Sequence, residues 1–193
     1  MTAPSDRPIA FHIGIAVHDL DATARRYEQI FGPLQWQRWE SPLPAMPWDP
    51  ESSAARLKIA YGRMPGMTFE LIQVLAGETV HTAFLRRHGE GVHHLGVWTP
   101  DVQAAAAVAV AAGATVRAAL LGRDGTMTVQ LTPKSTPEEI VSAIHPGAIA
   151  YLDLGAGGLE VEFVGPGSLV GLRQVLGAAF DNVIVAPDWG AGG

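Results

Sequence analysis

The chain has 193 residues, of which 48% are hydrophobic and 17% charged, so it fits one large domain or two small halves that share a core. It contains no cysteine, which excludes disulfide bonds, a thiolate nucleophile and any cysteine-ligated metal site. The formal net charge of −6, from 13 Lys and Arg against 19 Asp and Glu, argues against a nucleic-acid partner. Because no signal peptide is visible and no apolar stretch can span a bilayer, we expect a cytoplasmic protein with no membrane partner.

The first half of the chain predicts a strand, a helix, three more strands and a short second helix. Asp19 follows the first strand as a helix N-cap, and Gly32 ends that helix. A stretch with four prolines at 41–53 predicts a loop. The predicted elements are strands at 8–17, 34–39, 56–61 and 67–75, and helices at 20–31 and 79–88.

The pattern then restarts as an internal repeat. When segment 94–103 is laid over segment 12–21, a histidine, the glycine two positions later, the aspartate seven positions later and the apolar residue eight positions later all coincide. A helix at 101–112 follows, as a helix follows the first strand. The last two strands, at 148–154 and 159–164, mirror the strands at 56–61 and 67–75. Each half is therefore strand–helix–strand–strand–strand.

The repeat predicts an α+β fold in which two tandem βαβββ modules form an open, curved β-barrel. The expected organisation is a first module at 9–76, a connecting helix at 77–90, a second module at 91–165, and a C-terminal helix with a flexible tail at 166–193. The spacing between equivalent residues grows from 82 to 92, so the second module contains an insertion, near 123–147. Thr136 and Pro137 are typical of a helix start, so the insertion is either a lid over a site or surface elaboration.

Two histidines and two glutamates occupy equivalent positions of the repeat: His12 and His94 in the opening strands, Glu70 and Glu162 in the closing strands. An acid between large apolar residues of a core strand is costly to bury unless it is paired or bound to a cation. Two modules that curve their sheets together would bring all four side chains to one centre. Imidazole and carboxylate suit one divalent metal ion (Zn, Mn, Co, Ni or Fe), so we expect the barrel to enclose a metal site. The alternative is four ordinary polar residues on half-exposed strands.

With these features the sequence resembles the vicinal oxygen chelate superfamily, nearest to the branch that contains methylmalonyl-CoA epimerase and glyoxalase I. The resemblance rests on the repeated strand–helix–three-strand unit, the openings HIGIAV and HHLGV, and the ending GxxxE at 158–162, and it covers about residues 9–165. It implies an enzyme that acts on a small-molecule substrate and forms a homodimer. The metal ligands that it implies, on strands one, four, five and eight, are His12, Glu70, His94 and Glu162.

Two neighbouring residues compete for these assignments. Only His94 aligns with His12, so strand alternation predicts that His93 points the other way and packs behind the site. Glu160 shares a face with Glu162, and either carboxylate could reach the metal. The family pattern favours Glu162.

The resemblance implies an isomerase, epimerase or lyase that acts on a small carbonyl or thioester substrate through a metal-stabilised enolate. In the epimerases a glutamate acts as the base, and its position in the family pattern corresponds to about Lys58 in this sequence. Lys58 could act as an acid or base if burial lowered its pKa, and is otherwise a solvated strand residue. In a glyoxalase I-type lactoylglutathione lyase, Glu70 or Glu162 would move the proton instead. An extradiol-type dioxygenase, which needs two histidines and one carboxylate, and a metal-free ligand-binding module stay open as alternatives.

Large side chains outside the ligand set could form the substrate pocket. The candidates are Trp36, Trp39, Trp48, Trp98 and His145, with simple packing, or solvent exposure for His145, as the alternative. The remaining histidines have no expected role at the site. We expect three of them to be exposed: His18, His81 and His88.

Overall fold

The computed structural model describes residues 8–64, 66–121, 130–155 and 158–183. The first module contains β1 (Ile9–Ala16), α1 (Leu20–Phe31), β2 (Gln37–Leu43), β3 (Ala55–Met64) and β4 (Met67–Ala76). After α2 (Val80–His88), the second module contains β5 (Gly91–Trp98), α3 (Val102–Ala111), β6 (Thr115–Ala119), α4 (Pro137–Ala143), β7 (Ile149–Asp153) and β8 (Glu160–Val164). The chain continues with α5 (Pro166–Leu176), η1 (Gly177–Ala179) and α6 (Phe180–Val183). None of these described helices has the length and apolar character needed to cross a membrane.

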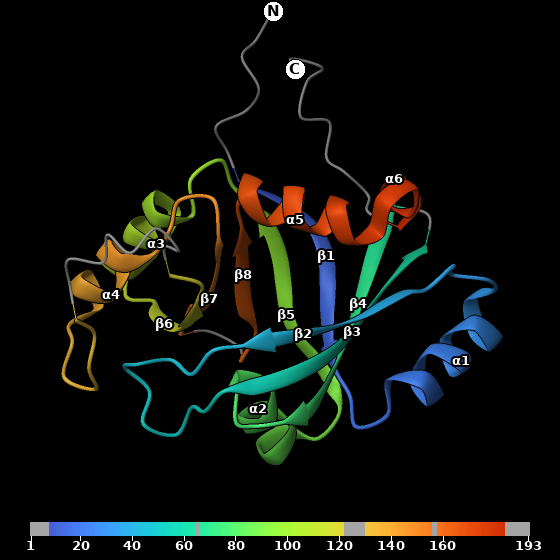
Figure 1. Cartoon of the computed structure of the whole chain (residues 1–193), viewed down its shortest axis with the longest axis horizontal. Coiled ribbons are helices and arrows are strands. Elements are labelled where there is room, and N and C mark those ends of the chain that lie inside the picture. The colour runs from blue at the N-terminus through green and yellow to red at the C-terminus, as the bar shows by residue number, and fades with distance from the viewer. Residues whose placement is uncertain (1–7, 65, 122–129, 156–157, 184–193) are drawn as a thin grey trace, which may run out of the picture.

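One curved, open sheet joins the two modules (Figure 1). Its eight described strands follow the order β2-β3-β4-β1-β5-β8-β7-β6. In each module the first strand pairs in parallel with the last, β1 with β4 and β5 with β8, and β1 pairs antiparallel with β5 at the centre. The order reads the same from either end when equivalent strands are exchanged, which is the pseudo-twofold relation that the repeat predicts. The expected α+β fold of two βαβββ modules is confirmed, and both paired modules belong to one chain.

Helices α1 and α3 cover the face of the sheet that is opposite to His12. Each helix begins at the aspartate of the repeat, since Asp19 and Asp101 each accept a hydrogen bond of 2.9 Å from the backbone N–H three residues later. The buried residues of the two helices pack into separate hydrophobic clusters, one in each module. These helices therefore leave the concave face of the sheet to other elements.

The C-terminal helices cover part of that concave face. Helix α5 crosses in front of the central strands (Figure 1). Leu176 of α5 and Phe180 of α6 pack there with Phe11, Leu57 and Ile59 from the sheet. The concave face is thus closed at one side by residues from outside the two modules.

The predicted strand at 34–39 shows the largest shift of boundaries in the structure. The strand expected at 34–39 begins at Gln37 and runs to Leu43, into the proline-rich segment that was expected to be a loop. Pro42 is tolerated because β2 lies at the edge of the sheet, where a strand has only one neighbour and a missing N–H need not break the ladder.

The described part of the insertion belongs to the core of the second module. Helix α4 begins at Thr136 with a capping box, and it buries Ile140 and Val141 in the cluster that also holds α3. This packing lies on the face away from His12, so α4 elaborates the module and does not cover the concave face. Residues 122–129 of the insertion, and the expected flexible tail beyond 183, lie outside the described residues.

Candidate metal centre and cavity

Two rows of paired residues cross the middle of the sheet. One row consists of Tyr61 on β3, Glu70 on β4, Gly14 on β1 and His94 on β5. The other row consists of Tyr151 on β7, Glu162 on β8, Gly96 on β5 and His12 on β1. Each row contains a tyrosine, a glutamate, a glycine and a histidine in that order, so the pseudo-twofold relation exchanges one row with the other.

The two glycines make room for the histidines. A Cβ atom at Gly14 would lie 1.9 Å from the His94 ring, and a Cβ atom at Gly96 would lie 1.9 Å from the His12 ring. Each imidazole therefore lies directly over the glycine of the other module. The His-x-Gly spacing of the repeat, together with the antiparallel β1–β5 pairing, brings the two rings face to edge, with centroids 5.2 Å apart.

The two histidines and the two glutamates meet in one buried cluster. The His12 Nε2 atom lies 3.1 Å from the His94 Nε2 atom. It also lies 3.2 Å from Glu70 Oε2 and 3.0 Å from Glu162 Oε2. The His94 Nε2 atom lies 3.1 Å and 3.5 Å from the same two oxygens. All four residues are buried, and the most exposed of them, Glu70, is 4% exposed.

These spacings fit one metal ion among the four side chains. With bonds of roughly 2.1 Å, neighbouring ligand atoms are about 3.0 Å apart in an octahedron and about 3.4 Å apart in a tetrahedron. Glu162 Oε2 is buried, and its contacts with the two imidazole Nε2 atoms do not have the geometry of regular hydrogen bonds, which is costly for a carboxylate oxygen unless a cation is near. The donor set of imidazole nitrogens and carboxylate oxygens suits a first-row divalent ion.

Charge couples the four residues. Burial opposes the charged form of His94, but hydrogen bonds to Glu162 and Glu70, and their charges, raise its pKa to about 10. The same balance raises the pKa of His12. Burial opposes the ionised form of both glutamates, and so does their mutual repulsion at Glu70, yet the histidines hold both carboxyl pKa values below the ordinary value. Without a cation, protons on the histidines therefore compensate the two carboxylates.

Sequence reasoning missed two tyrosines at this site. Burial, with the nearby charges of Glu70 and Glu162, raises the pKa of both Tyr61 and Tyr151 well above the ordinary value. Both phenols stay protonated, and strand pairing places Tyr61 beside Glu70 and Tyr151 beside Glu162. The signal was present, because each tyrosine occurs in the strand that precedes the glutamate-bearing strand of its module.

The structure contradicts the expectation that His93 points away from His94. The β1–β5 pairing passes from Gly14↔His94 to Ile15↔Val92, so His93 is the extra residue of a β-bulge. The bulge places the His93 Nδ1 atom 3.1 Å from the His94 Nδ1 atom. Because His94 directs its Nε2 atom into the cluster, its Nδ1–H can donate to His93, and this contact fixes the orientation of the His94 ring.

The expectation that His81 is exposed is wrong. His81 lies in the first turn of α2 and is 1% exposed. Its ring centroid is 4.5 Å from that of His93 and 5.5 Å from that of Tyr151. Burial lowers its pKa to about 4, so the imidazole is neutral at pH 7. Phe84 and Leu85 follow at helical spacing, and that pattern could have predicted that His81 lies on the packed face of the helix.

A second group of ring nitrogens surrounds the same bulge. Those of His81, His93 and His94 lie within 4.8 Å of one another, but His94 already belongs to the four-residue cluster. The other two histidines expected at the surface, His18 and His88, are exposed.

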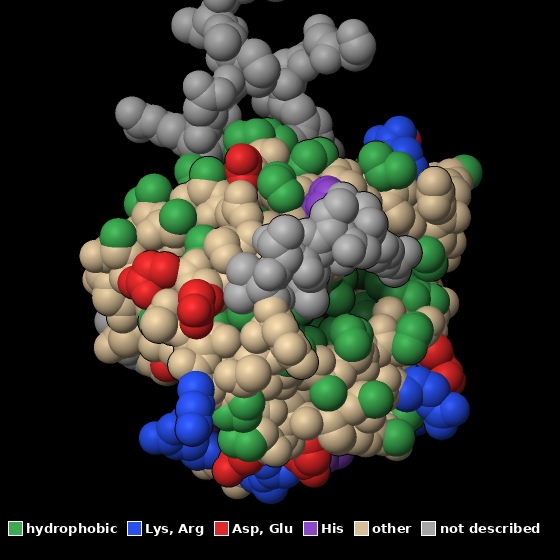
Figure 2. Space-filling view, turned by 60° about the vertical axis from the view of Figure 1, so that its left-hand side comes forward, with side chains coloured by type: hydrophobic (Ala, Val, Ile, Leu, Met, Phe, Trp, Pro, Cys, Tyr) green, Lys and Arg blue, Asp and Glu red, His purple; other side chains and the backbone are tan. Residues whose placement is uncertain are grey.

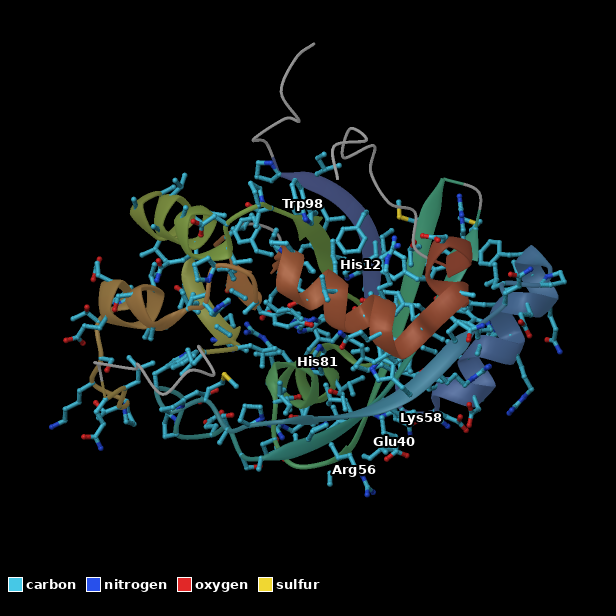
Figure 3. All side chains as sticks on the ribbon, turned by 45° about the horizontal axis from the view of Figure 1, so that its top comes forward. His12, Glu40, Arg56, Lys58, His81 and Trp98 are labelled. Atoms are coloured by element: carbon cyan, nitrogen blue, oxygen red, sulfur yellow. The ribbon has the colours of Figure 1, made fainter. Side chains whose placement is uncertain are left out.

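Lys58 points away from the cluster, which contradicts its expected role as a proton carrier. Its Nζ atom lies 2.6 Å from the Asp21 carboxylate of α1. Figure 3 shows Lys58 with Glu40 and Arg56 on the outer side of β2 and β3. Strand alternation is the physical reason, because the residues on either side of Lys58 in β3 face the concave side of the sheet.

A cavity of about 360 Å³ opens beside the cluster. Its polar wall is formed by Glu70, Glu162, Tyr61, Tyr151 and His81. Figure 2 shows hydrophobic side chains around and inside a hollow on one face of the molecule. The hydrophobic part of the lining includes Phe11, Trp39, Leu57, Ile59, Val164 and Leu172.

Of the five residues expected to line the substrate pocket, only Trp39 is among the described residues that line this cavity. Trp36 packs beneath α1 on the outer face of the sheet. Trp48 packs against the core of the second module, and Trp98 packs against the cluster under α5. His145 is exposed, and its Nδ1 atom accepts a hydrogen bond from the backbone N–H two residues later.

The fold and the cluster together define a class of protein in which two paired βαβββ modules share one buried set of two histidines and two glutamates. The chain belongs to the Glyoxalase/Bleomycin resistance protein/Dioxygenase superfamily, whose sequence model matches residues 11–130. The superfamily that the resemblance predicted is therefore confirmed.

Several solved structures are similar to this chain. A hypothetical protein from Bacillus halodurans is 19% identical, with a TM-score of 0.49, over 81% of this chain and 92% of that chain. A variant of Streptomyces coelicolor methylmalonyl-CoA epimerase, in complex with 2-nitronate-propionyl-CoA, is 23% identical, with a TM-score of 0.47, over 82% and 96%. Methylmalonyl-CoA epimerase from Mycobacterium tuberculosis is 20% identical, with a TM-score of 0.47, over 85% and 90%. The search of curated proteins found no match.

The close approach at the glycines gives a first prediction. Gly14→Ala or Gly96→Ala should displace the facing imidazole and weaken zinc binding by on the order of 10- to 100-fold, as other changes that misorient a ligand do. Gly91→Ala is the matched control on β5, because its Cβ would have only an ordinary contact of 3.9 Å, with Phe84. Isothermal titration of the metal-free proteins with zinc measures the change. Equal zinc affinity in all three variants would contradict the steric account.

The raised histidine pKa values give a second prediction. The pKa of His94 is about 10 and that of His12 is raised, so the metal-free protein holds protons on this pair at pH 7. A cation must displace these protons, and its apparent affinity should therefore rise as the pH increases from 6 towards 9. Calorimetry in buffers of different ionisation enthalpy should show proton release on zinc binding. Binding without any proton release is the contrary outcome.

Proposed function

We propose that the chain is a divalent-metal-dependent isomerase, epimerase or lyase that moves a proton next to the carbonyl of a small carbonyl or thioester substrate. The observation that carries the proposal is the buried cluster of His12, Glu70, His94 and Glu162 beside the cavity. The two glutamates line the cavity themselves, so a small molecule that enters it reaches the cluster directly.

The proposed chemistry needs a Lewis acid and a proton carrier. A divalent cation held by the four residues would lower the pKa of the C–H bond next to a substrate carbonyl. Glu70 and Glu162 face the cavity, so either carboxylate can accept that proton and return it. Tyr61 and Tyr151, each paired with one of these glutamates across neighbouring strands, can donate their hydroxyl hydrogens to the carboxylates.

The position of Lys58 supports a carboxylate as the proton carrier. Because Lys58 is paired with Asp21 on the other face of the sheet, it does not contact a molecule in the cavity. This favours an arrangement of the glyoxalase I type, in which a metal-ligating glutamate moves the proton, as the second candidate function.

Two other classes fit the site less well. An extradiol-type dioxygenase would use only three of the four ligands, and a metal-free binding module would leave two glutamates buried with only protonated histidines to compensate them. The homodimer and the cytoplasmic location expected from the sequence stay predictions.

Metal content tests the ligand assignment. His94→Ala removes one of the four ligands, so the purified variant should lose its bound metal after dialysis, whereas Lys58→Ala, on the outer face of the sheet, should keep it. Elemental analysis of the two variants and the parent measures this difference. A His94→Ala protein with the metal content of the parent would show that the assignment is wrong.

Solvent-deuterium exchange tests the proposed reaction. With candidate thioesters, hemithioacetals and 2-oxo compounds, the metal-loaded protein should exchange one C–H that the stripped protein leaves unchanged. Glu70→Gln or Glu162→Gln, whichever carboxylate carries the proton, should slow this exchange by on the order of 10²- to 10⁴-fold. Proton NMR follows the loss of signal. Oxygen consumption with a catechol, and no exchange with any compound, would place the protein among the dioxygenases.

A further inference from the structure

We infer that the cavity selects an uncharged, mostly hydrocarbon chelator, a molecule with two neighbouring oxygens and an apolar body that carries neither phosphate nor carboxylate. The inference rests on the proposed function, because the two oxygens would meet the metal site, and it adds the substrate class. It follows from what lines the cavity and from where the nearby cations are directed.

The described lining of the cavity contains no positively charged side chain. None of its residues is Lys or Arg, and its charged side chains are Glu70 and Glu162. An anionic group that entered would lose its hydration and would meet two carboxylates instead of a counter-charge. The metal, once bound, would compensate the carboxylates but would leave no excess positive charge for a second anion.

The arginines next to the lining in the sequence are paired elsewhere. Arg117 precedes a lining residue of β6, but its Nε atom lies 3.6 Å from Glu160. Arg173 follows a lining residue of α5, but it pairs with Asp181 at 3.1 Å and stacks over the Phe180 ring at 4.5 Å. Arg38 and Arg56 also precede lining residues, but they pair with Asp21 at 3.5 Å and with Glu40 at 3.6 Å. None of these four guanidinium groups is therefore available to hold a phosphate or a carboxylate in the cavity.

The remaining wall suits a hydrocarbon body. Trp39 stacks on Tyr61 with ring centroids 5.3 Å apart and an interplanar angle of 11°, which makes a flat aromatic surface. Phe11 and Ile59 add apolar area on the sheet side, and Leu172 adds it on α5. Burial of apolar groups against such a wall is favourable in proportion to the area removed from water, so affinity should increase with the length of the hydrocarbon chain.

One polar group in the wall is buried and unpaired. The Nε2 atom of His81 is buried and has no hydrogen-bond partner among the described residues, and the side chain lines the cavity. Figure 3 places His81 between α2 and α5. This nitrogen can form one hydrogen bond with an uncharged hydroxyl or carbonyl of the bound molecule, so no charged partner is needed.

Three hydroxamates test the inference, because each presents two neighbouring oxygens to a divalent metal. The probes are acetohydroxamate, octanohydroxamate, and the octano compound with a terminal carboxylate. On the zinc-loaded protein, octanohydroxamate should bind at least about 100-fold more tightly than acetohydroxamate, since each buried methylene contributes about 0.8 kcal/mol. The carboxylate-ended probe should lose most of that gain. Titration calorimetry measures all three, with the zinc content checked afterwards.

A charge placed at the cavity tests the location. Val175 and Val170 both lie on α5, with exposed fractions of 56% and 58%, and only Val175 is among the described lining residues. V175K should tighten the carboxylate-ended probe by up to about fivefold, as expected for an exposed ion pair, and V170K should leave it unchanged. An equal effect of both substitutions would show that the probes bind outside the cavity, and would overturn the inference.

The two proposals fail in different ways. If acetohydroxamate binds equally well to the zinc-loaded and the stripped protein, the proposed metal site is wrong, while the ratio between the two long probes on either form still reports on the cavity. If the carboxylate-ended probe binds as tightly as octanohydroxamate, or if octanohydroxamate gains nothing over acetohydroxamate, the inferred substrate class is wrong and the proposed function stands.

Discussion

The burial of two carboxylates side by side is the constraint on which the rest of this structure depends. The oxygens that Glu70 and Glu162 offer lie within 4.8 Å of each other and are shielded from water. Removing one such ion from water costs several kcal/mol, and the repulsion between two adds to it. The surroundings compensate with two histidines that contact the pair and with two protonated tyrosines that are paired with the glutamates, each residue from a different strand. Six strands must hold their register for this to work.

The tandem repeat meets that requirement by using one local pattern twice. Antiparallel pairing of β1 with β5 sets His12 opposite Gly96 and Gly14 opposite His94. The parallel pairing inside each module then adds the glutamate beside each glycine. Two rows with the same order of residues therefore follow from one repeated sequence pattern and from the pairing of β1 with β5. The cluster forms where the two rows meet.

The same logic explains how much of the site could be predicted from the sequence. The four clustered residues could be predicted because a histidine and a glutamate occur at equivalent positions in both modules. The helix starts could be predicted because Asp19 and Asp101 cap them locally. The orientation of His93 could not, because a one-residue bulge reverses strand alternation and leaves no mark in the sequence. The spacing of His81, Phe84 and Leu85 could have predicted the packed face of α2, but the place where this non-repeated helix packs, next to His93, has no counterpart in the repeat. The role expected for Lys58 came from the position of the glutamate base in the epimerases, although strand alternation alone predicts that its side chain points outward.

The bulges also show how a symmetric cluster acquires asymmetric surroundings. A bulge precedes the clustered histidine in each opening strand, at Phe11 in β1 and at His93 in β5, and turns these two side chains to the same face as the histidines. On the His93 side, α2 fills the space, with the Phe84 ring 5.1 Å from the His93 ring. On the other side, Phe11 lines the cavity. Helix α2 exists in one copy, and on the Phe11 side the C-terminal helices α5 and α6 pack instead. The two equivalent sides of the cluster therefore have different surroundings, and the wall on the Phe11 side is apolar.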